Sequence, residues 1–169
     1  VKLKVNDTEL TQEFTIHKNP TSEGSIDDIK AQFEFVNEIN GVVDKAHKAI
    51  ENIRNMKTDL KKFQSDYADN EFAKDLIEKS KSILESIDKI ENELYQTKNQ
   101  SNQDPLNFGV RLTNNLGNLN SALEGGDFGP TVQDVLVKNE LIEKVNIQLT
   151  EYNKICLLYT SDAADDIPG

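Results

Sequence analysis

The stretch of sequence that decides the fold covers residues 25–63 and reads SIDDIKAQFEFVNEINGVVDKAHKAIENIRNMKTDLKKF. Its apolar residues recur at steps of three and four, the spacing that places them on one face of an α-helix. They are Ile29, Phe33, Val36, Ile39, Val43, Ala46, Ile50, Ile53, Leu60 and Phe63. Ser25 can cap the first turn, where Asp27 and Asp28 suit the positive end of the helix dipole. Because only Gly41 interrupts the pattern, the stretch predicts one helix of about 40 residues, about 60 Å long.

Apolar residues recur at helical spacing in three further segments, residues 72–97, 104–124 and 130–155. The third helix would start at Asp104-Pro105, an N-cap followed by a first-turn proline. The connections between the segments are short, which favours antiparallel neighbours. We therefore predict a mainly α fold, an up-and-down bundle of three to four long antiparallel helices that occupies residues 25–155.

A different periodicity precedes the helices. Residues 1–17 alternate between apolar and polar side chains, with a turn signal at Asn6-Asp7. The apolar positions are Val1, Leu3, Val5, Leu10, Phe14 and Ile16. This pattern predicts a β-hairpin. Because a lone hairpin is only marginally stable in water, we interpret residues 1–18 as the terminal hairpin of a truncated β-sandwich domain, joined to the bundle by a polar linker at residues 19–24.

Charge and composition argue against several classes of protein. The 169 residues carry a formal net charge of −11, which together with the lack of a basic run argues against a nucleic-acid surface. No stretch approaches the ~18 apolar residues that a membrane-spanning helix requires. A single cysteine leaves no internal disulfide and no cysteine-rich metal site. Because Val1 opens directly in a strand pattern, we expect the natural N-terminus to lie upstream.

The residue types that carry chemistry form no recognisable site. Neither His17 nor His47 has a ligand partner at metal-binding spacing, although Asp44 stands at i−3 of His47. The carboxylates at helical spacing from lysines are interpreted as solvated ion-pair faces. Those considered as pairs are Glu34, Glu38, Asp88, Glu91 and Glu93. The glycine-rich residues 125–129 follow a helix and are predicted to form a helix–helix turn, not a phosphate loop. We therefore assign no catalytic, cofactor-binding or metal-binding residue.

The C-terminal residues 156–169 form a separate segment. Residues 156–165 read CLLYTSDAAD, which matches one reading frame of a transposase adapter used in sequencing libraries. We interpret residues 156–169 as an artefactual tail and expect Ile155 to be the last residue here that belongs to the natural protein. On this interpretation Cys156 is not a natural cysteine, and no redox or nucleophilic role is assigned to it.

Three stretches of the bundle, residues 31–54, 90–98 and 104–116, resemble the C-terminal region of large bacterial proteins that carry a sortilin-type β-propeller. Those proteins are often labelled as glycosyl hydrolases with neuraminidase-like repeats. The end of the hairpin pattern, residues 14–20, is similar to the last strands of their small β domain. The resemblance implies export to the periplasm or cell exterior. The propeller, where a ligand site of that family would lie, falls outside this sequence.

From these observations we expect a non-catalytic accessory region of a larger secreted β-propeller protein. Its partners would be the upstream domains of the same chain, with no nucleic acid, no membrane span and no cofactor. The alternative is a helical module that binds another protein or a peptide in a groove between its helices. An exposed apolar patch would be required for either role.

Overall fold

The computed structural model describes residues 1–101 and 103–165, including their side chains except those of Pro105 and residues 158–165. Two short antiparallel strands precede four α-helices and two single turns of 3-10 helix. In chain order the elements are β1 (Lys2–Val5), β2 (Thr8–Thr11), α1 (Ile26–Asp66), η1 (Glu71–Ala73), α2 (Lys74–Leu94), η2 (Asp104–Leu106), α3 (Leu112–Leu123) and α4 (Val132–Asp165). The predicted fold class, a mainly α bundle preceded by a β-hairpin, is confirmed.

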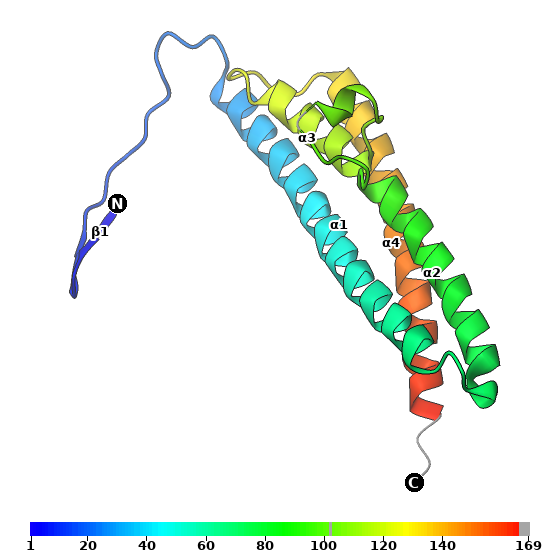
Figure 1. Ribbon diagram of the computed structural model, residues 1–169. Coiled ribbons are helices and arrows are strands. Elements are labelled where there is room, and N and C mark those ends of the chain that lie inside the picture. The colour runs from blue at the N-terminus through cyan, green and yellow to red at the C-terminus, as the bar shows by residue number, and fades with distance from the viewer. Residues whose placement is uncertain (102, 166–169) are drawn as a thin grey trace.

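The bundle has three arms, and the middle arm, which is interrupted, runs antiparallel to the other two (Figure 1). α1 forms one arm and α4 another, while α2 and α3 follow each other along the same side of α1 (Figure 1). Both α2 and α3 pack against α1 and α4 but make little contact with each other. They are therefore stacked end to end instead of lying side by side. The side-chain hydrogen bonds that join α1 to this arm include Gln64–Ser80 at 2.7 Å, Arg54–Glu91 at 2.7 Å, Asn40–Asn120 at 2.9 Å and Gln32–Leu123 at 2.5 Å.

The apolar core lies between the three arms, and α1 supplies most of it. The largest fully buried side chains of the core are Ile39, Ile53, Ile87, Leu94, Leu116 and Val145. The bounds of α1 match the predicted helix, and Ser25 caps it by accepting a hydrogen bond from the Asp28 amide at 3.0 Å. The apolar stripe differs in its first turns, because Phe35 is buried while Phe33 is 68% exposed. Lys138 of α4 lies over the Phe35 ring, with its Nζ 5.0 Å from the ring centroid. The position of α4 therefore accounts for the inward orientation of Phe35 instead of Phe33.

The ends of the middle helices were predicted incorrectly. α2 ends at Leu94, earlier than Thr97, and α3 begins at Leu112 instead of Asp104. Asp104-Pro105 opens only the single turn η2, so that Leu106 is 87% exposed. Phe72, which was assigned to the apolar stripe of the second helix, lies in η1 and is 97% exposed. In both cases apolar residues at helical spacing fall in a short turn, and of these turns η1 contacts only α2, which it adjoins, while η2 contacts no described helix.

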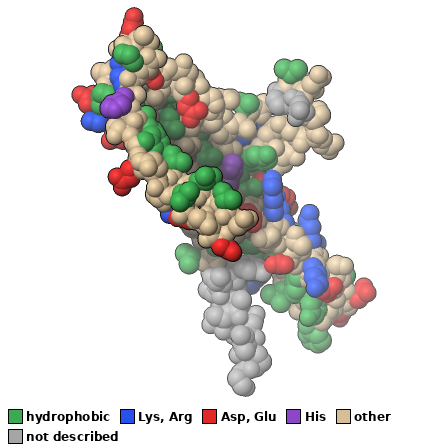
Figure 2. Space-filling model, turned by 90° about the vertical axis from the view of Figure 1, so that its left-hand side faces the viewer, with side chains coloured by type: hydrophobic (Ala, Val, Ile, Leu, Met, Phe, Trp, Pro, Cys, Tyr) green, Lys and Arg blue, Asp and Glu red, His purple; other side chains and the backbone are tan. Residues whose placement is uncertain are grey.

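The hairpin stands apart from the bundle. Its turn at Asn6-Asp7 is as predicted, and Asn6 has the left-handed φ of 52° that this tight turn requires. Leu3 and Leu10 lie opposite each other and are 56% and 63% exposed. Neither strand packs against a helix in the part of the chain that the structure describes. Figure 2, in which the side that carries the hairpin faces the viewer, shows hydrophobic side chains along this N-terminal segment.

At the other end of the chain, α4 continues beyond Ile155 to Asp165. The helix is continuous across the predicted start of the tail. Ile155 and Cys156, on either side of that point, both pack against the core. Residues 166–169 of that predicted tail lie outside the described residues. Among the helices described, none combines the length and the apolar character that crossing a membrane requires.

Candidate functional site at the waist of the bundle

The middle arm is broken opposite the centre of α1, and the loop of residues 95–111 fills the break. We call this region the waist and define it by the loop together with the facing residues 47–57 of α1 and the last turns of α2, residues 88–94. Long loops without regular secondary structure are uncommon inside compact bundles, and many of them carry function. The waist is also where the structure has a polar hollow, so it is the candidate site of this chain.

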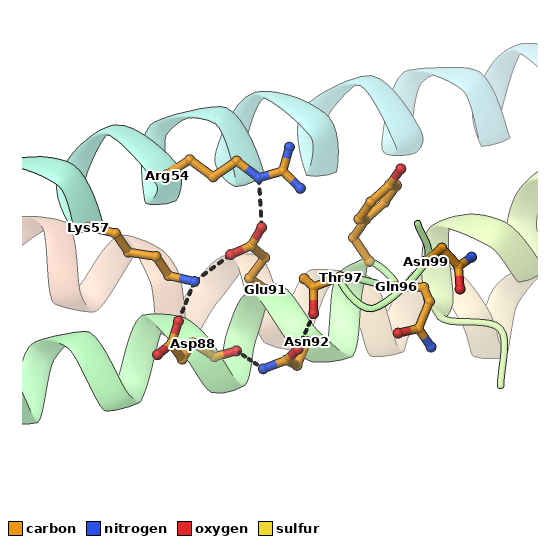
Figure 3. A pocket seen from close by; sticks show the side chains of 9 residues that line it. Arg54, Lys57, Asp88, Glu91, Asn92, Gln96, Thr97 and Asn99 are labelled. Atoms are coloured by element: carbon orange, nitrogen blue, oxygen red, sulfur yellow. Dashed lines mark hydrogen bonds and ion pairs between the residues drawn. The ribbon is translucent and has the colours of Figure 1, made fainter. Parts of the chain in front are cut away.

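A network of four charged side chains joins α1 to α2 at the waist (Figure 3). Arg54 Nε donates to Glu91 Oε1 at 2.7 Å. Lys57 Nζ donates to Glu91 Oε2 and forms a second ion pair with Asp88. The Glu91 side chain is only 5% exposed, whereas that of Arg54 is 55% exposed. The carboxylate of Glu91 is therefore the buried centre of the network, and its partners reach outward from it.

The electrostatics of Glu91 follow from these contacts. Burial alone would raise the pKa of its carboxyl, because removal from water disfavours the charged form. The hydrogen bonds and charges of Lys57 and Arg54 act in the opposite direction and hold the pKa of Glu91 below its ordinary value. Glu91 is thus ionised at neutral pH. With Asp88, Arg54 and Lys57 also charged, the network is electrically balanced.

An aromatic residue borders the network. The Tyr95 ring has the Arg54 guanidinium carbon 5.5 Å from its centroid, and the His47 ring meets it edge-on with centroids 6.2 Å apart. Two hollows adjoin there. One of about 400 Å³ is polar, lined by the four charged residues of the network and by residues 92, 95–97 and 99. The other, of about 390 Å³, is bordered by Ile50 and His47. Arg54 and Tyr95 line both hollows, so the two hollows are neighbours, and we refer to the pair of them as the groove.

Side-chain bonds fix the loop at both of its ends. The buried Gln96 donates from Nε2 to the Gly109 carbonyl at 2.6 Å and accepts from the Lys98 amide at 3.1 Å. Thr113, in the first turn of α3, donates its hydroxyl to the Leu94 carbonyl at 2.8 Å. Asp104 accepts from the backbone amide of Gln100 at 2.5 Å, as expected for a residue that satisfies backbone donors. These bonds hold the C-terminal end of α2 close to the N-terminal end of α3, and the loop of residues 95–111 connects the two ends.

The candidate residues singled out from the sequence are distributed widely. Among the residues described, no three His, Cys, Asp or Glu side chains come together as metal ligands. Glu38 pairs with Lys138 of α4, and Glu93 lies 3.9 Å from Arg111. Asp88 and Glu91 were predicted to face solvent, and for Glu91 this was wrong, because Arg54 and Lys57 enclose it. The sequence did contain a signal for this contact. Two cations, Arg54 and Lys57, lie three residues apart on one helix, and two carboxylates, Asp88 and Glu91, lie three residues apart on the next.

The glycine-rich residues 125–129 form the predicted helix–helix turn, between α3 and α4. The end of the polar linker packs closely against this turn. A Cβ added to Gly24 would lie 1.7 Å from the Asp127 carbonyl oxygen, so glycine is required by the close approach of two backbones. Gln32 of α1 also donates to the Gly126 carbonyl at 2.6 Å. The turn is therefore a packing element at the start of α1.

Comparison of the chain with protein-family models, with curated proteins and with solved structures finds no match. No family is therefore shown for it, and its function has to be argued from the geometry above.

Proposed function

We propose that the chain is a non-catalytic accessory region of a larger protein, a bundle that is attached through its hairpin to a neighbouring β domain. The resemblance of residues 31–54, 90–98 and 104–116 to propeller-protein C-terminal regions supports a secreted β-propeller protein as that parent. A periplasmic or extracellular location follows from the same resemblance. Partners would be the upstream domains of the same chain.

The observation that carries this proposal is the exposed apolar face of the hairpin. Leu3 and Leu10 form a cross-strand pair on that face, and Val5 lies on the same face two residues from Leu3. A two-stranded hairpin needs further strands or a packing surface to be stable in water. Because no described helix covers the hairpin, a β-sheet outside this chain segment is the surface that would complete it.

The bundle has the properties of a spacer. None of the residues of its core comes from the hairpin or the linker, so the helices do not depend on the β domain for their packing. The 41 residues of α1 correspond to a rod about 60 Å long. A hairpin docked at one end would hold the far end of the rod at that distance from the β domain.

The test begins with recovery of the coding sequence upstream of Val1, which the proposal expects to encode a β domain. Residues 1–155 are then produced with and without that domain, and hydrogen exchange of the hairpin amides is measured. The proposal expects fast exchange in isolation and protection in the longer chain. Replacing Leu3 and Leu10 with serine should abolish the protection, while the matched replacement of Lys2 and Lys4, on the opposite face, should not.

Two outcomes would contradict the proposal. One is an upstream sequence that encodes no β domain. The other is a hairpin whose amides are as protected in the isolated chain as those of α1, because it would then need no partner.

A second candidate function is a helical module that binds another protein or a peptide. The groove at the waist favours it, since its two hollows combine a polar and a partly apolar lining around one arginine. The two functions are compatible, because the hairpin and the waist lie on separate parts of the chain.

A further inference from the structure

We infer that the waist binds a free carboxylate joined to an apolar group, as found at the C-terminal residue of a peptide, and that Arg54 is the residue that contacts the carboxylate. The inference deepens the peptide-binding candidate. It does not rest on the accessory role, which depends on the hairpin alone.

Arg54 is ordered before any ligand arrives. Its Nε is held by the buried Glu91, and its guanidinium lies over the Tyr95 ring. A surface arginine normally loses considerable side-chain freedom when it binds, and a guanidinium fixed in advance avoids most of that loss. The two terminal nitrogens make no hydrogen bond to another described residue. In Figure 3 the guanidinium lies on the side of Nε that faces away from Lys57.

The geometry of these two nitrogens suits a carboxylate. A planar pair of N–H donors matches the two oxygens of a carboxylate and forms two parallel charge-assisted hydrogen bonds. Glu91 cannot fill this place, because it occupies Nε on the other edge of the guanidinium. Lys57 is already shared by Asp88 and Glu91, so it does not compete for the ligand. The side-chain amide of Asn99 lines the same hollow and is not engaged with another described residue, which leaves a neutral donor for the ligand.

The second hollow accounts for the apolar part of the ligand. It shares Arg54 and Tyr95 with the first, so it lies next to a carboxylate bound by Arg54 and is the nearest place for a group attached to that carboxylate. Ile50 and the His47 ring border it. Glu51 also lines this hollow and repels an anion there. The carboxylate is therefore directed to the polar hollow and the apolar side chain to the other, which is the arrangement of a C-terminal residue.

The experiment uses the full chain and N-acetyl-leucine as the probe, with N-acetyl-leucinamide as the uncharged control. Because the chain contains only two arginines, Arg54 and Arg111, the Nε–Hε NMR signals are easily assigned. We expect N-acetyl-leucine to shift the Arg54 signal with a Kd of about 1 mM, a weak affinity suited to one ion pair and one small side chain. The signal of Arg111 should stay in place, and the amide should bind at least about tenfold more weakly, as loss of one charged contact implies.

Substitution and further probes make the inference refutable. Arg54→Lys keeps the charge but not the paired donors, and it should weaken binding at least about tenfold. Lys61→Gln, an exposed residue of α1, should leave binding unchanged. Equal shifts with acid and amide, or no shift of Arg54 in the unaltered protein, would overturn the carboxylate site. Acetate binding as tightly as N-acetyl-leucine would overturn the apolar hollow, and equal binding of isocaproate, which has the same carbon chain without the amide, would point to a small organic acid instead of a peptide terminus.

Discussion

Replacing Glu91 with glutamine removes the buried centre of the waist network while keeping the shape of the side chain. The carboxylate accepts two charge-assisted hydrogen bonds, each worth about 1.5–3 kcal/mol when well buried, whereas glutamine has one acceptor oxygen and no charge, so one bond is lost and the other is weakened. The Arg54 contribution must be reduced to about 1 kcal/mol or less, because that side chain is 55% exposed and screened by water. Lys57 is only 16% exposed but retains Asp88 as a partner. We therefore expect Glu91→Gln to lower the free energy of unfolding by about 2–3 kcal/mol.

Urea titration followed by far-ultraviolet circular dichroism measures this change. For a domain of this size the free energy of unfolding falls by about 2 kcal/mol per molar urea, so the midpoint should move down by about 1 M. Asp88→Asn is the matched control, because Asp88 is 55% exposed, and it should cost less than about 1 kcal/mol. A midpoint for Glu91→Gln that equals or exceeds that of the unaltered chain would refute the reasoning. In that case the cost of burying the charges would cancel their attraction.

Three further predictions concern pH and the start of α1. Because the pKa of Glu91 is held below its ordinary value of 4.5, its stabilising effect is complete above that value and is lost as the pH falls through the folded-state pKa. The difference in urea midpoint between the unaltered chain and Glu91→Gln should thus shrink in acid, and a difference that grows there would contradict it. Gly24→Ala should destabilise the chain by about 1–3 kcal/mol, since its Cβ would meet the Asp127 carbonyl. Gly41→Ala, in open space on α1, is the matched control and should stabilise by about 0.5–1 kcal/mol in the same titration. Ser25→Ala should lower the thermal midpoint by removing the cap of α1, a loss of about 1 kcal/mol, and an unchanged midpoint would show that the cap is dispensable.

The sequence predicted those elements whose signals are local. The cap at Ser25 and the long apolar period predicted α1, and Asn6-Asp7 predicted the hairpin turn. The start of α3 was missed because residues 104–108 also show apolar residues at helical spacing. Asp104 there binds backbone amides of the preceding residues, which is a competing local structure that opposes a continuous helix. The burial of Phe35 instead of Phe33 could not be predicted from the sequence either, since it depends on the position of a neighbouring helix.

The waist could be predicted only in part. Its pairs of charges are regular in sequence, yet their contact depends on the register of α2 against α1, which no local pattern fixes. The position of Tyr95 is a different case, because Tyr95 is the residue that directly follows the early end of α2 at Leu94. The groove is thus a consequence of where one helix stops.

An interrupted arm gains nothing for packing, because an unbroken helix would bury more apolar surface with fewer ordered loop residues. Buried polar contacts nevertheless stabilise the interruption, because Gln96 and Thr113 each form a hydrogen bond across it. The same break leaves Arg54 half in water, with its Nε held by Glu91 and its terminal nitrogens free of other described residues. A purely structural ion pair would be as strong with the arginine covered. A loop that admits a ligand to the terminal nitrogens of Arg54 explains their exposure. For that reason the waist is the part of the bundle where binding should be sought first.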